Sequence, residues 1–367
     1  MILGWDPARV RVFVVGILEW RHADDYPPFP QERRRDQRLV EHFQAQGIPA
    51  DQIVYLQDRA ATTATVRDAF DDHLAAARPG DLLVVYFAGH GARSDRGVTY
   101  FASHDAGDPR NHGWPVAEIP KAIERHFGGS HALLLADCCY SGGLADAVDD
   151  HGDRVAYATL VSSLASELST GNWTFTEGIY AALRGQAFAD ADGSRTITLQ
   201  EMADQVAANL AFAEEQLATF RIVGDFDAHA VVAAARPRPS ADVGRRVEVV
   251  QNDVWYPAQI IDSGGGRFHV HYFGYEDSDD EWVTADRIRE AKRPRYPAGT
   301  LVEVLWNKEW YPARVHDCIA GVHHIHYDGY DHSNDEWVST ARPTASSIRR
   351  GTTRRAIRPA SRSGRAI

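Results

Sequence analysis

Residues 131–143 read HALLLADCCYSGG, in which an aspartate and two adjacent cysteines follow an apolar run. A second apolar run, VVYFAGHG, ends at His90. In a parallel sheet, functional side chains gather at the carboxyl ends of the strands, so His90 and Cys139 can meet there. An imidazolium lowers the pKa of a neighbouring thiol, and the thiolate is a nucleophile. The alternative is that the cysteines are small buried core residues and that Gly-His-Gly is a turn.

The segments that must position these residues alternate between apolar strands and amphipathic helices. We expect strands at 9–18, 52–58, 81–91, 131–139, 154–163 and 228–235, and helices at 31–48, 62–77, 115–127, 174–185 and 199–216. A short hairpin is expected at 97–103. Apolar strands separated by amphipathic helices indicate a mostly parallel sheet covered by helices on both faces. Residues 1–235 are therefore predicted to form one α/β domain.

The C-terminal third of the chain contains a tandem repeat. After a proline-rich segment at 236–242, interpreted as a linker, matching aromatic motifs recur at a constant offset of 55 residues. Trp255 corresponds to Trp310, and Tyr272 corresponds to Tyr327. Short alternating strands predict two small all-β barrels, at 243–292 (repeat 1) and 297–342 (repeat 2). The segment 343–367 is rich in arginine and poor in apolar residues, so we expect it to be disordered.

Composition narrows the class of protein. The chain has 367 residues, a net charge of −12 and three cysteines. So few cysteines do not suit a disulfide framework and favour a reducing cytoplasm. We expect the source to be a bacterium. No apolar stretch is long enough to span a membrane, so no membrane partner is expected. From Arg342 onward there are eight arginines and no acidic residue. This tail is the only segment that suits nucleic acid, because acidic clusters in the repeats oppose phosphate binding.

The pair YFAGHG and DCCYSGG resembles the metacaspase branch of the caspase-like cysteine peptidases, over residues 9 to 235. The resemblance implies a caspase-like fold with His90 as the general base and Cys139 as the nucleophile. It also implies an oxyanion site formed by the backbone N–H groups of Cys139 and Gly91. Cys138 falls at a variable position of the motif and is interpreted as a packing residue, because strand alternation points it to the opposite face.

The same resemblance implies specificity for basic substrates. Asp137 matches an aspartate that lines the pocket for arginine or lysine, and Asp36 is the nearest match to a second pocket aspartate. Two carboxylates can hold a guanidinium by charge-assisted hydrogen bonds. The alternative for Asp36 is a solvated helix face.

Residues 190–201, DADGSRTITLQE, have the oxygen spacing of an EF-hand calcium loop. The candidate ligands are Asp190, Asp192, Ser194, Thr196 and Glu201. Arg195 stands where such a loop needs glycine. The alternative is a turn followed by a helix whose start is a capping box of Thr198 and Glu201. We expect that the protein requires no cofactor, and calcium is the one ion that the sequence suggests it could bind.

The repeats resemble Tudor and chromo-barrel domains, which bind methylated lysine or arginine. The resemblance implies an aromatic cage of Trp306, Tyr311, Tyr327 and Tyr330 in repeat 2, and of Tyr256, Tyr272 and Tyr275 in repeat 1. Gln251 replaces the tryptophan in repeat 1. Aromatic faces attract such cations. The alternative is that these rings are barrel core.

Taken together, the resemblances imply a cysteine endopeptidase that cleaves after arginine or lysine. A tandem Tudor-like module that binds a protein partner would recruit or regulate it. The alternative is a catalytically silent caspase-like scaffold whose repeats bind a basic, methylated or unmethylated protein.

Overall fold

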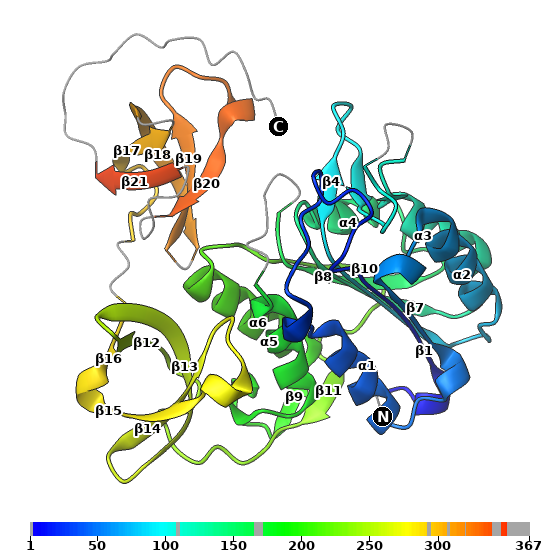
Figure 1. Cartoon of the computed structure of the whole chain (residues 1–367), viewed down its shortest axis with the longest axis horizontal. Coiled ribbons are helices and arrows are strands. Elements are labelled where there is room, and N and C mark those ends of the chain that lie inside the picture. Colours follow the sequence, from blue (N-terminus) through cyan, green and yellow to red (C-terminus); the bar gives the residue numbers. More distant parts are fainter. Residues whose placement is uncertain are drawn as a thin grey trace. The chain divides into compact units, whose positions relative to one another are not determined.

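The computed structural model describes residues 3–107, 111–164, 172–291, 295–306, 309–319, 321–339 and 346–350. The chain forms two compact units, Met1–Arg289 and Glu290–Ile367. The first unit holds a mixed α/β region and one small all-β sheet, and the second holds an all-β barrel (Figure 1). No helix in the described ranges combines the length and the apolar character that crossing a membrane requires.

A six-stranded sheet in the order β10-β8-β7-β3-β1-β2 is the centre of the α/β region. Its strands are β1 (Val10–Gly16), β2 (Ile53–Gln57), β3 (Leu82–Ala88), β7 (His131–Asp137), β8 (Ala156–Val161) and β10 (Thr219–Val223). The first five are parallel to one another, and β10 is antiparallel to β8. Strands β1 and β3 are buried along their whole length, as expected for parallel strands covered on both faces.

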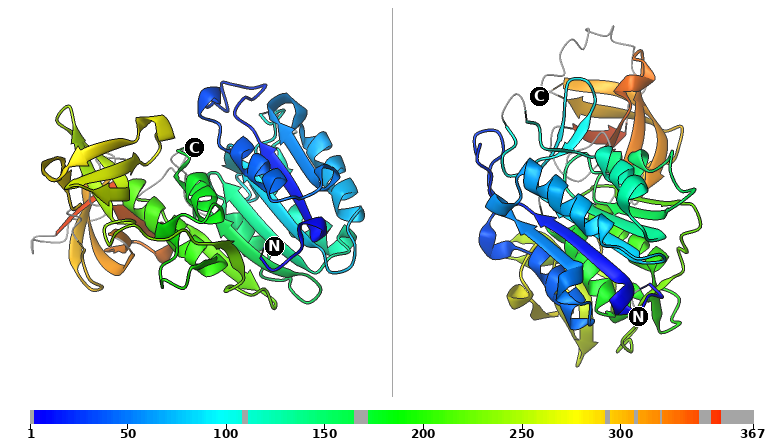
Figure 2. Two further views of the ribbon diagram at one scale, coloured as in Figure 1. Left: turned by 90° about the horizontal axis from the view of Figure 1, so that it is seen from below. Right: turned by 90° about the vertical axis from the view of Figure 1, so that its right-hand side faces the viewer.

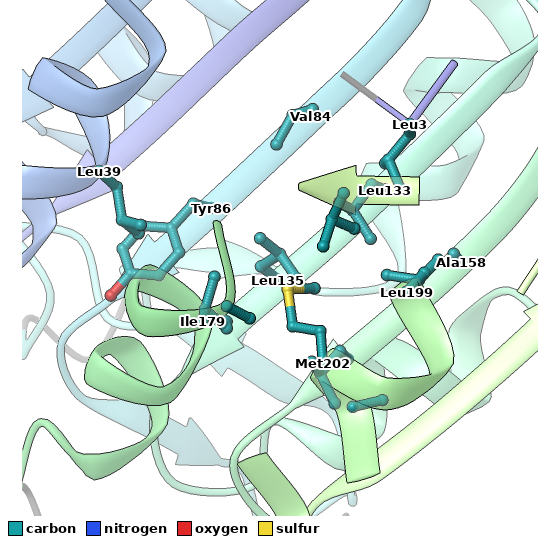
Figure 3. Close-up of a cluster of buried hydrophobic side chains, with 14 of the residues drawn as sticks. Leu3, Leu39, Val84, Tyr86, Leu133, Leu135, Ala158, Ile179, Leu199 and Met202 are labelled. Atoms are coloured by element: carbon teal, nitrogen blue, oxygen red, sulfur yellow. The ribbon is translucent and has the colours of Figure 1, made fainter. Parts of the chain in front are cut away.

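Helices cover both faces of this sheet (Figure 2). They are α1 (Asp36–Ala45), α2 (Thr63–Ala75), α3 (Glu118–His126), α4 (Gly142–Ala147), α5 (Thr174–Leu183) and α6 (Leu199–Ala213). Alternate residues of β1 belong to different cores: Val12 and Val14 pack with α1, α5 and α6, whereas Phe13 and Val15 pack with α2 and α3. Figure 3 shows the first of these cores, where Leu135 and Tyr86 face Ile179 and Met202.

Several small elements differ from the sequence-based expectation. Strand β10 and helix α4 are not among the predicted elements. The segment expected as a strand at 228–235 forms β11 (Val231–Ala234) in a separate two-stranded sheet with β9 (Thr196–Thr198). The expected hairpin belongs to a three-stranded sheet of β4 (Gly91–Arg93), β5 (Thr99–Phe101) and β6 (Trp114–Pro115). Short strands at edges carry little periodic signal, because only a few residues alternate.

The two repeats have the same strand plan. Repeat 1 contains β12 (Arg246–Gln251), β13 (Val254–Gly264), β14 (Arg267–Tyr272), β15 (Glu281–Thr284) and β16 (Ile288–Arg289). Repeat 2 contains β17 (Leu301–Trp306), β18 (Glu309–Ile319), β19 (Val322–Tyr327), β20 (Glu336–Ser339) and β21 (Ser346–Arg350), and it closes into a barrel. Each of the first four strands of repeat 2 starts 55 residues after the corresponding strand of repeat 1. The register irregularities in β13 and β18 are separated by the same 55 residues.

Two expectations about the connecting segments are wrong. The segment 236–242 does not separate two units, because repeat 1 belongs to the first unit. Arg238 donates to the carbonyls of Ala187 and Asp190, and Ser240 bonds to Ser263. The expected disordered tail also begins too early, since 346–350 pair with β17. An open strand edge accepts any extended segment within reach, whatever its composition. Residues 351–367 lie outside the described ranges.

Candidate functional site

His90 and Cys139 lie at the carboxyl ends of two adjacent parallel strands. Ala88, the last residue of β3, pairs in register with Asp137, the last residue of β7, so both strands end at the same edge of the sheet. One pocket is lined by both residues and by Asp137. The rest of its lining is Leu18, Phe29, Ala88, Gly89, Cys138, Asn172 and Trp173. The structure therefore brings the predicted base, nucleophile and one predicted pocket acid together.

The two adjacent cysteines have different environments. Cys138 is 2% exposed and belongs to the core beneath α2 and α3, so its predicted packing role is confirmed. Burial, together with the charges of Cys139 and Asp137, raises the pKa of the Cys138 thiol well above its usual value. Cys139 is partly exposed. Tyr140, the next residue, has a φ of 56°, so the backbone turns sharply after Cys139 in a conformation that costs energy for a non-glycine residue.

Two serines at the end of β8 hold this turn in place. The backbone N–H of Cys138 donates to Ser162 Oγ at 3.1 Å, and Ser163 Oγ donates to the Cys138 carbonyl at 3.0 Å. Ser141 exchanges hydrogen bonds with Ser163 through both its backbone and its hydroxyl. Sequence reasoning missed both serines, although their position at a third strand end is a signal that points to this edge of the sheet.

The His90 ring is held by a main-chain carbonyl and by aromatic rings. Its Nε2 lies 2.8 Å from the Pro27 carbonyl oxygen, and its ring centroid lies 4.5 Å from that of Trp20 and 4.6 Å from that of Phe29. Because a carbonyl can only accept, Nε2 carries the proton and Nδ1 is the basic nitrogen of the neutral ring. Burial lowers the pKa of His90, against the opposing effect of the Pro27 hydrogen bond. Pro27 acts through its backbone, so no sequence signal could have identified it.

Gly91 is required by the close approach of the Cys139 backbone. A Cβ atom at Gly91 would lie 1.8 Å from the Cys139 carbonyl oxygen. Gly91 pairs with Phe101, and the neighbouring Ala102 N–H donates to the His90 carbonyl. Hydrogen bonding alternates along an antiparallel ladder, so Gly91 and Phe101 form a non-hydrogen-bonded pair and the Gly91 N–H points away from β5. This N–H is the second donor that the resemblance assigns to the oxyanion.

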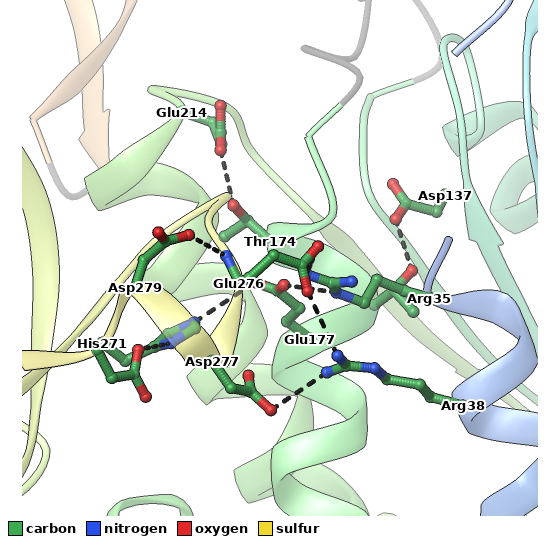
Figure 4. Close-up of polar contacts among 12 residues, drawn as sticks. Arg35, Arg38, Asp137, Thr174, Glu177, Glu214, His271, Glu276, Asp277 and Asp279 are labelled. Carbon is green, nitrogen blue, oxygen red and sulfur yellow. Dashed lines mark hydrogen bonds and ion pairs between the residues drawn. The ribbon is translucent and has the colours of Figure 1, made fainter. Parts of the chain in front are cut away.

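Asp137 is a buried carboxylate in the pocket wall. It accepts a hydrogen bond of 2.7 Å from Thr176 of α5 (Figure 4) and is 9% exposed. Burial raises the pKa of Asp137 to about 7, although hydrogen bonds from Thr176 and Ser162 favour the ionised form. A bound cation would favour the ionised form further. A carboxylate in the pocket wall is a group that can pair with a positive charge.

Asp36 is fully buried and does not line the pocket. The alternative of a solvated helix face is therefore wrong, but the structure does not bring Asp36 to the pocket surface either. Its Oδ2 accepts from Arg34 Nη1 at 2.9 Å and from the Tyr55 hydroxyl at 2.8 Å. Burial raises the pKa of Asp36 against the effect of Arg34. Burial, with the charges of both Asp137 and Asp36, raises the pKa of Tyr86, so the two carboxylates act on one phenol.

In the loop at 190–201 the predicted capping box forms. The Thr198 hydroxyl accepts from the Glu201 N–H, and the Glu201 carboxylate accepts from the Thr198 N–H. Carboxylate oxygens of Asp190, Asp192 and Glu201 lie within 4.8 Å of one another. Arg195 has a φ of 68°, so it adopts the left-handed backbone that glycine would supply in an EF-hand. Calcium binding at this loop stays a prediction.

Each repeat contains three mutually tilted tyrosine rings. In repeat 1 the ring centroids of Tyr256 and Tyr275 are 5.8 Å apart at 87°, and in repeat 2 those of Tyr311 and Tyr330 are 6.4 Å apart at 76°. The third ring, Tyr272 or Tyr327, belongs to the buried barrel core, so for these two residues the alternative interpretation as core is correct. Their hydroxyls donate to Glu281 and Glu336. The side chain of Trp306 lies outside the described residues.

Repeat 1 docks on the α/β region through a network of charged residues (Figure 4). Arg35 pairs with Glu177 of α5 and with Glu276 of repeat 1. His271 of β14 lies 2.8 Å from Asp280 and 3.6 Å from Glu177. Burial disfavours its charged form, but the hydrogen bonds and charges of these two acids outweigh burial and raise the pKa of His271 to about 10. Nothing in the sequence predicted this docking, because its partners are distant along the chain.

Comparison with known proteins gives one family match. No curated protein matches the chain. Among solved structures, the crystal structure of a protein from Geobacter sulfurreducens is 13% identical and has a TM-score of 0.46, with coverage of 62% of this chain and 100% of that chain. Residues 244–294 match the model of the Agenet domain. Repeat 1 is therefore a Tudor-type module of the Agenet kind.

Proposed function

We propose that residues 1–235 are a cysteine endopeptidase that cleaves after arginine or lysine, and that the two repeats bind a protein partner that recruits or regulates it. One observation carries the proposal: His90, Cys139 and the buried Asp137 line one pocket at the ends of adjacent strands. The sequence resemblance to caspase-like peptidases of the metacaspase branch supports the same assignment. A sulfur nucleophile, a base and a buried acid in one pocket suit acyl transfer from a cationic substrate.

The reaction would proceed in two steps. Cys139 transfers its proton to His90 Nδ1 and attacks the carbonyl carbon, while the N–H groups of Cys139 and Gly91 stabilise the oxyanion. His90 then returns the proton to the departing amine as the carbon–nitrogen bond breaks. Water, deprotonated by His90, hydrolyses the thioester and restores the thiol. The Pro27 carbonyl maintains the required tautomer of His90 throughout.

Asp137 would select the substrate. An arginine or lysine side chain in the pocket would place its charge against this carboxylate, and the pair would form in a largely desolvated site. Asp36, which bonds to Arg34, would act on the pocket from behind Tyr86 rather than by direct contact. A substrate with an acidic residue at the same position would face repulsion from Asp137.

For the repeats, the match of repeat 1 to the Agenet family supports binding of a protein partner. The paired rings Tyr256 and Tyr275 suit a basic or methylated peptide, and the acidic residues Glu276 and Asp277 follow Tyr275 in the chain. The corresponding rings of repeat 2, Tyr311 and Tyr330, have a matching arrangement.

An activity-based probe tests the enzyme and its rival together. Peptidyl acyloxymethyl ketones with arginine or aspartate at the reactive end are incubated with the full chain, and the labelled residue is located by mass spectrometry. We expect the arginyl probe alone to label Cys139, with no label in Cys139→Ala. Absence of labelling by either probe, in protein that is folded, would favour the silent scaffold. Faster labelling by the aspartyl probe would contradict the role of Asp137.

A further inference from the structure

Four histidines gather on one side of repeat 2. His316 lies on β18, His324 and His326 lie on β19, and His332 begins the short helix η8 (His332–Asn334). The ring centroids of His326 and His332 are 4.4 Å apart, and that of His316 lies 5.6 Å from the first and 6.1 Å from the second. The cluster belongs to neither the candidate active site nor the tyrosine rings. Possible ligand atoms of His326, His332 and Asp335 lie within 4.8 Å of one another, and the His316 ring lies beside them.

Asp335 orients two of these rings through the same type of nitrogen. Its Oδ1 lies 2.7 Å from His326 Nδ1, and its Oδ2 lies 2.9 Å from His332 Nδ1. A carboxylate on Nδ1 leaves Nε2 as the basic nitrogen of each neutral ring. Neither Nε2 has a hydrogen-bonding partner among the described residues. The side chain of His332 is 77% exposed, so the cluster is open to solvent.

We propose that His316, His326 and His332 of repeat 2 bind one divalent transition-metal ion of the zinc class, with Asp335 as the residue that positions two of the ligands. The neutral imidazole ring of histidine is a ligand that suits such ions. A zinc–nitrogen distance of about 2.0–2.1 Å in a tetrahedral site places imidazole centroids about 5 Å apart. The centroid of His316 lies 5.6 and 6.1 Å from the other two, so its ring would turn toward them when the ion binds. Histidine ligands commonly donate their other nitrogen to a carboxylate, which is the bond that Asp335 makes here.

Repeat 1 shows what this site adds to the common fold. Fifty-five residues earlier, His271 and Asp280 reproduce the pair of His326 and Asp335, with a hydrogen bond of 2.8 Å. The other two positions differ: Ile261 replaces His316, and Asp277 replaces His332. The histidine–aspartate pair therefore belongs to the strand plan that the two repeats share, whereas the two further histidines occur in repeat 2 alone.

A metal ion at this point would connect three segments of the barrel. It would join β18, β19 and the loop that leads from Tyr330 to His332. Because Tyr330 is one of the predicted cage rings, the ion would restrict the loop that carries it. Metal binding would thereby make repeat 2 more rigid than repeat 1 near the predicted ligand site.

Zinc titration of the full chain tests the proposal. All proteins lack a polyhistidine tag and carry Cys139→Ala, because His90 and Cys139 could themselves bind zinc. The test variant combines His316→Ile with His332→Asp, which are the residues that repeat 1 has at these positions and that the same fold accepts. The control variant is His229→Gln, an exposed histidine outside the cluster. Binding is measured by calorimetry after removal of metal with a chelator.

We expect one zinc ion per chain to bind the parent and the control, and the affinity to fall at least about tenfold in the double variant. Cobalt should give visible absorption typical of tetrahedral nitrogen and oxygen ligands in the parent and the control but not in the double variant. Zinc should also raise the melting temperature of the parent but not that of the double variant. Circular dichroism establishes that each protein is folded. Equal zinc affinity in the parent and the folded double variant would overturn the proposal.

Discussion

The guanidinium of Arg35 lies 2.8 Å from Glu276 of repeat 1 and 2.9 Å from Glu177 of α5. Two of these three residues are adjacent in sequence to residues near the candidate pocket. Arg35 directly precedes Asp36, and Glu177 directly follows Thr176, whose hydroxyl donates to Asp137. Repeat 1 is thus joined to the α/β region by residues that are adjacent in sequence to Asp36 and to the hydrogen-bond donor of Asp137. We therefore predict that a change in repeat 1 alters the pocket through these short connections.

Replacing Glu276 tests this coupling. Glu276→Gln removes one of the two negative charges that Arg35 pairs with and should destabilise the first unit by about 1–3 kcal/mol. If the connection reaches the pocket, KM for an arginyl peptide should also rise several-fold. Asp286→Asn, on an exposed side chain of the same repeat, serves as the control. A lower melting temperature with unchanged kinetics would mean that the ion pair only holds repeat 1 in place.

The nucleophile is tested by replacing each of the two adjacent cysteines. Cys139→Ala should lower kcat by about a thousandfold or more. The other described thiol in the pocket lining belongs to Cys138, which is buried. Cys138→Ala removes a small core side chain and should reduce stability by about 1 kcal/mol while most activity remains. Peptide cleavage and thermal unfolding are measured for both. Equal loss of activity in two folded variants would refute the assignment of Cys139.

Asp137→Asn separates recognition from folding. The asparagine can still accept the bond from Thr176, so the variant should fold, but an arginyl peptide should lose about two to three powers of ten in kcat/KM. The pKa of Asp137 is raised to about 7 from 3.8, so its contribution to stability is full below about pH 4 and is lost as the pH rises to 7. The variant should therefore be at least as stable as the wild type at pH 8.

The same pKa predicts how binding depends on pH. Only the ionised carboxylate attracts a cation, so KM for an arginyl peptide should fall as the pH rises through about 7. A peptide with a neutral side chain at that position provides the control, because its KM does not depend on the charge of Asp137. Parallel pH profiles of KM for the two peptides would argue against direct contact between Asp137 and the substrate cation.

His271 should make the docking of repeat 1 pH-dependent. Its pKa is raised from 6.5 to about 10, so the imidazolium stabilises the fold fully below pH 6.5, and this contribution disappears as the pH rises to about 10. His271→Gln should accordingly destabilise the protein more at pH 6 than at pH 9.5, as measured by urea unfolding. His229→Gln should show no such difference. A constant penalty across this range would contradict the raised pKa.

The tyrosines that are not fully buried in the cores are the residues of the repeats that should decide ligand affinity. Tyr275→Ala and Tyr330→Ala each remove one ring from a pair and should weaken binding of a methylated basic peptide by about 0.5–2 kcal/mol at that repeat. Tyr272→Phe keeps the buried ring and loses only the hydroxyl bond to Glu281, so it should alter stability more than affinity. Calorimetry with methylated and unmethylated peptides distinguishes a cage from general peptide binding.

The sequence by itself determined the elements whose pattern is local. The apolar runs before His90 and Cys139 are long enough to specify buried parallel strands, and their common exit at one edge follows from that arrangement. The 55-residue offset likewise predicted the two matching strand plans, because identical spacing of apolar residues selects the same pairing. The opposite environments of Cys138 and Cys139 followed from alternation along a strand.

Only the tertiary structure decided the features that depend on distant or main-chain partners. The carbonyl of Pro27 carries no side-chain signal, yet it selects the tautomer of His90. Asp36 was expected at the pocket surface, but Arg34 and Tyr55 hold it inside, since a buried carboxylate takes whichever donors the packing brings. The docking of repeat 1 through Arg35 and the proximity of His316 to His332 bring together residues on separate segments. Contacts of this kind depend on how distant segments pack in space, and such packing produces no local periodic pattern in the sequence.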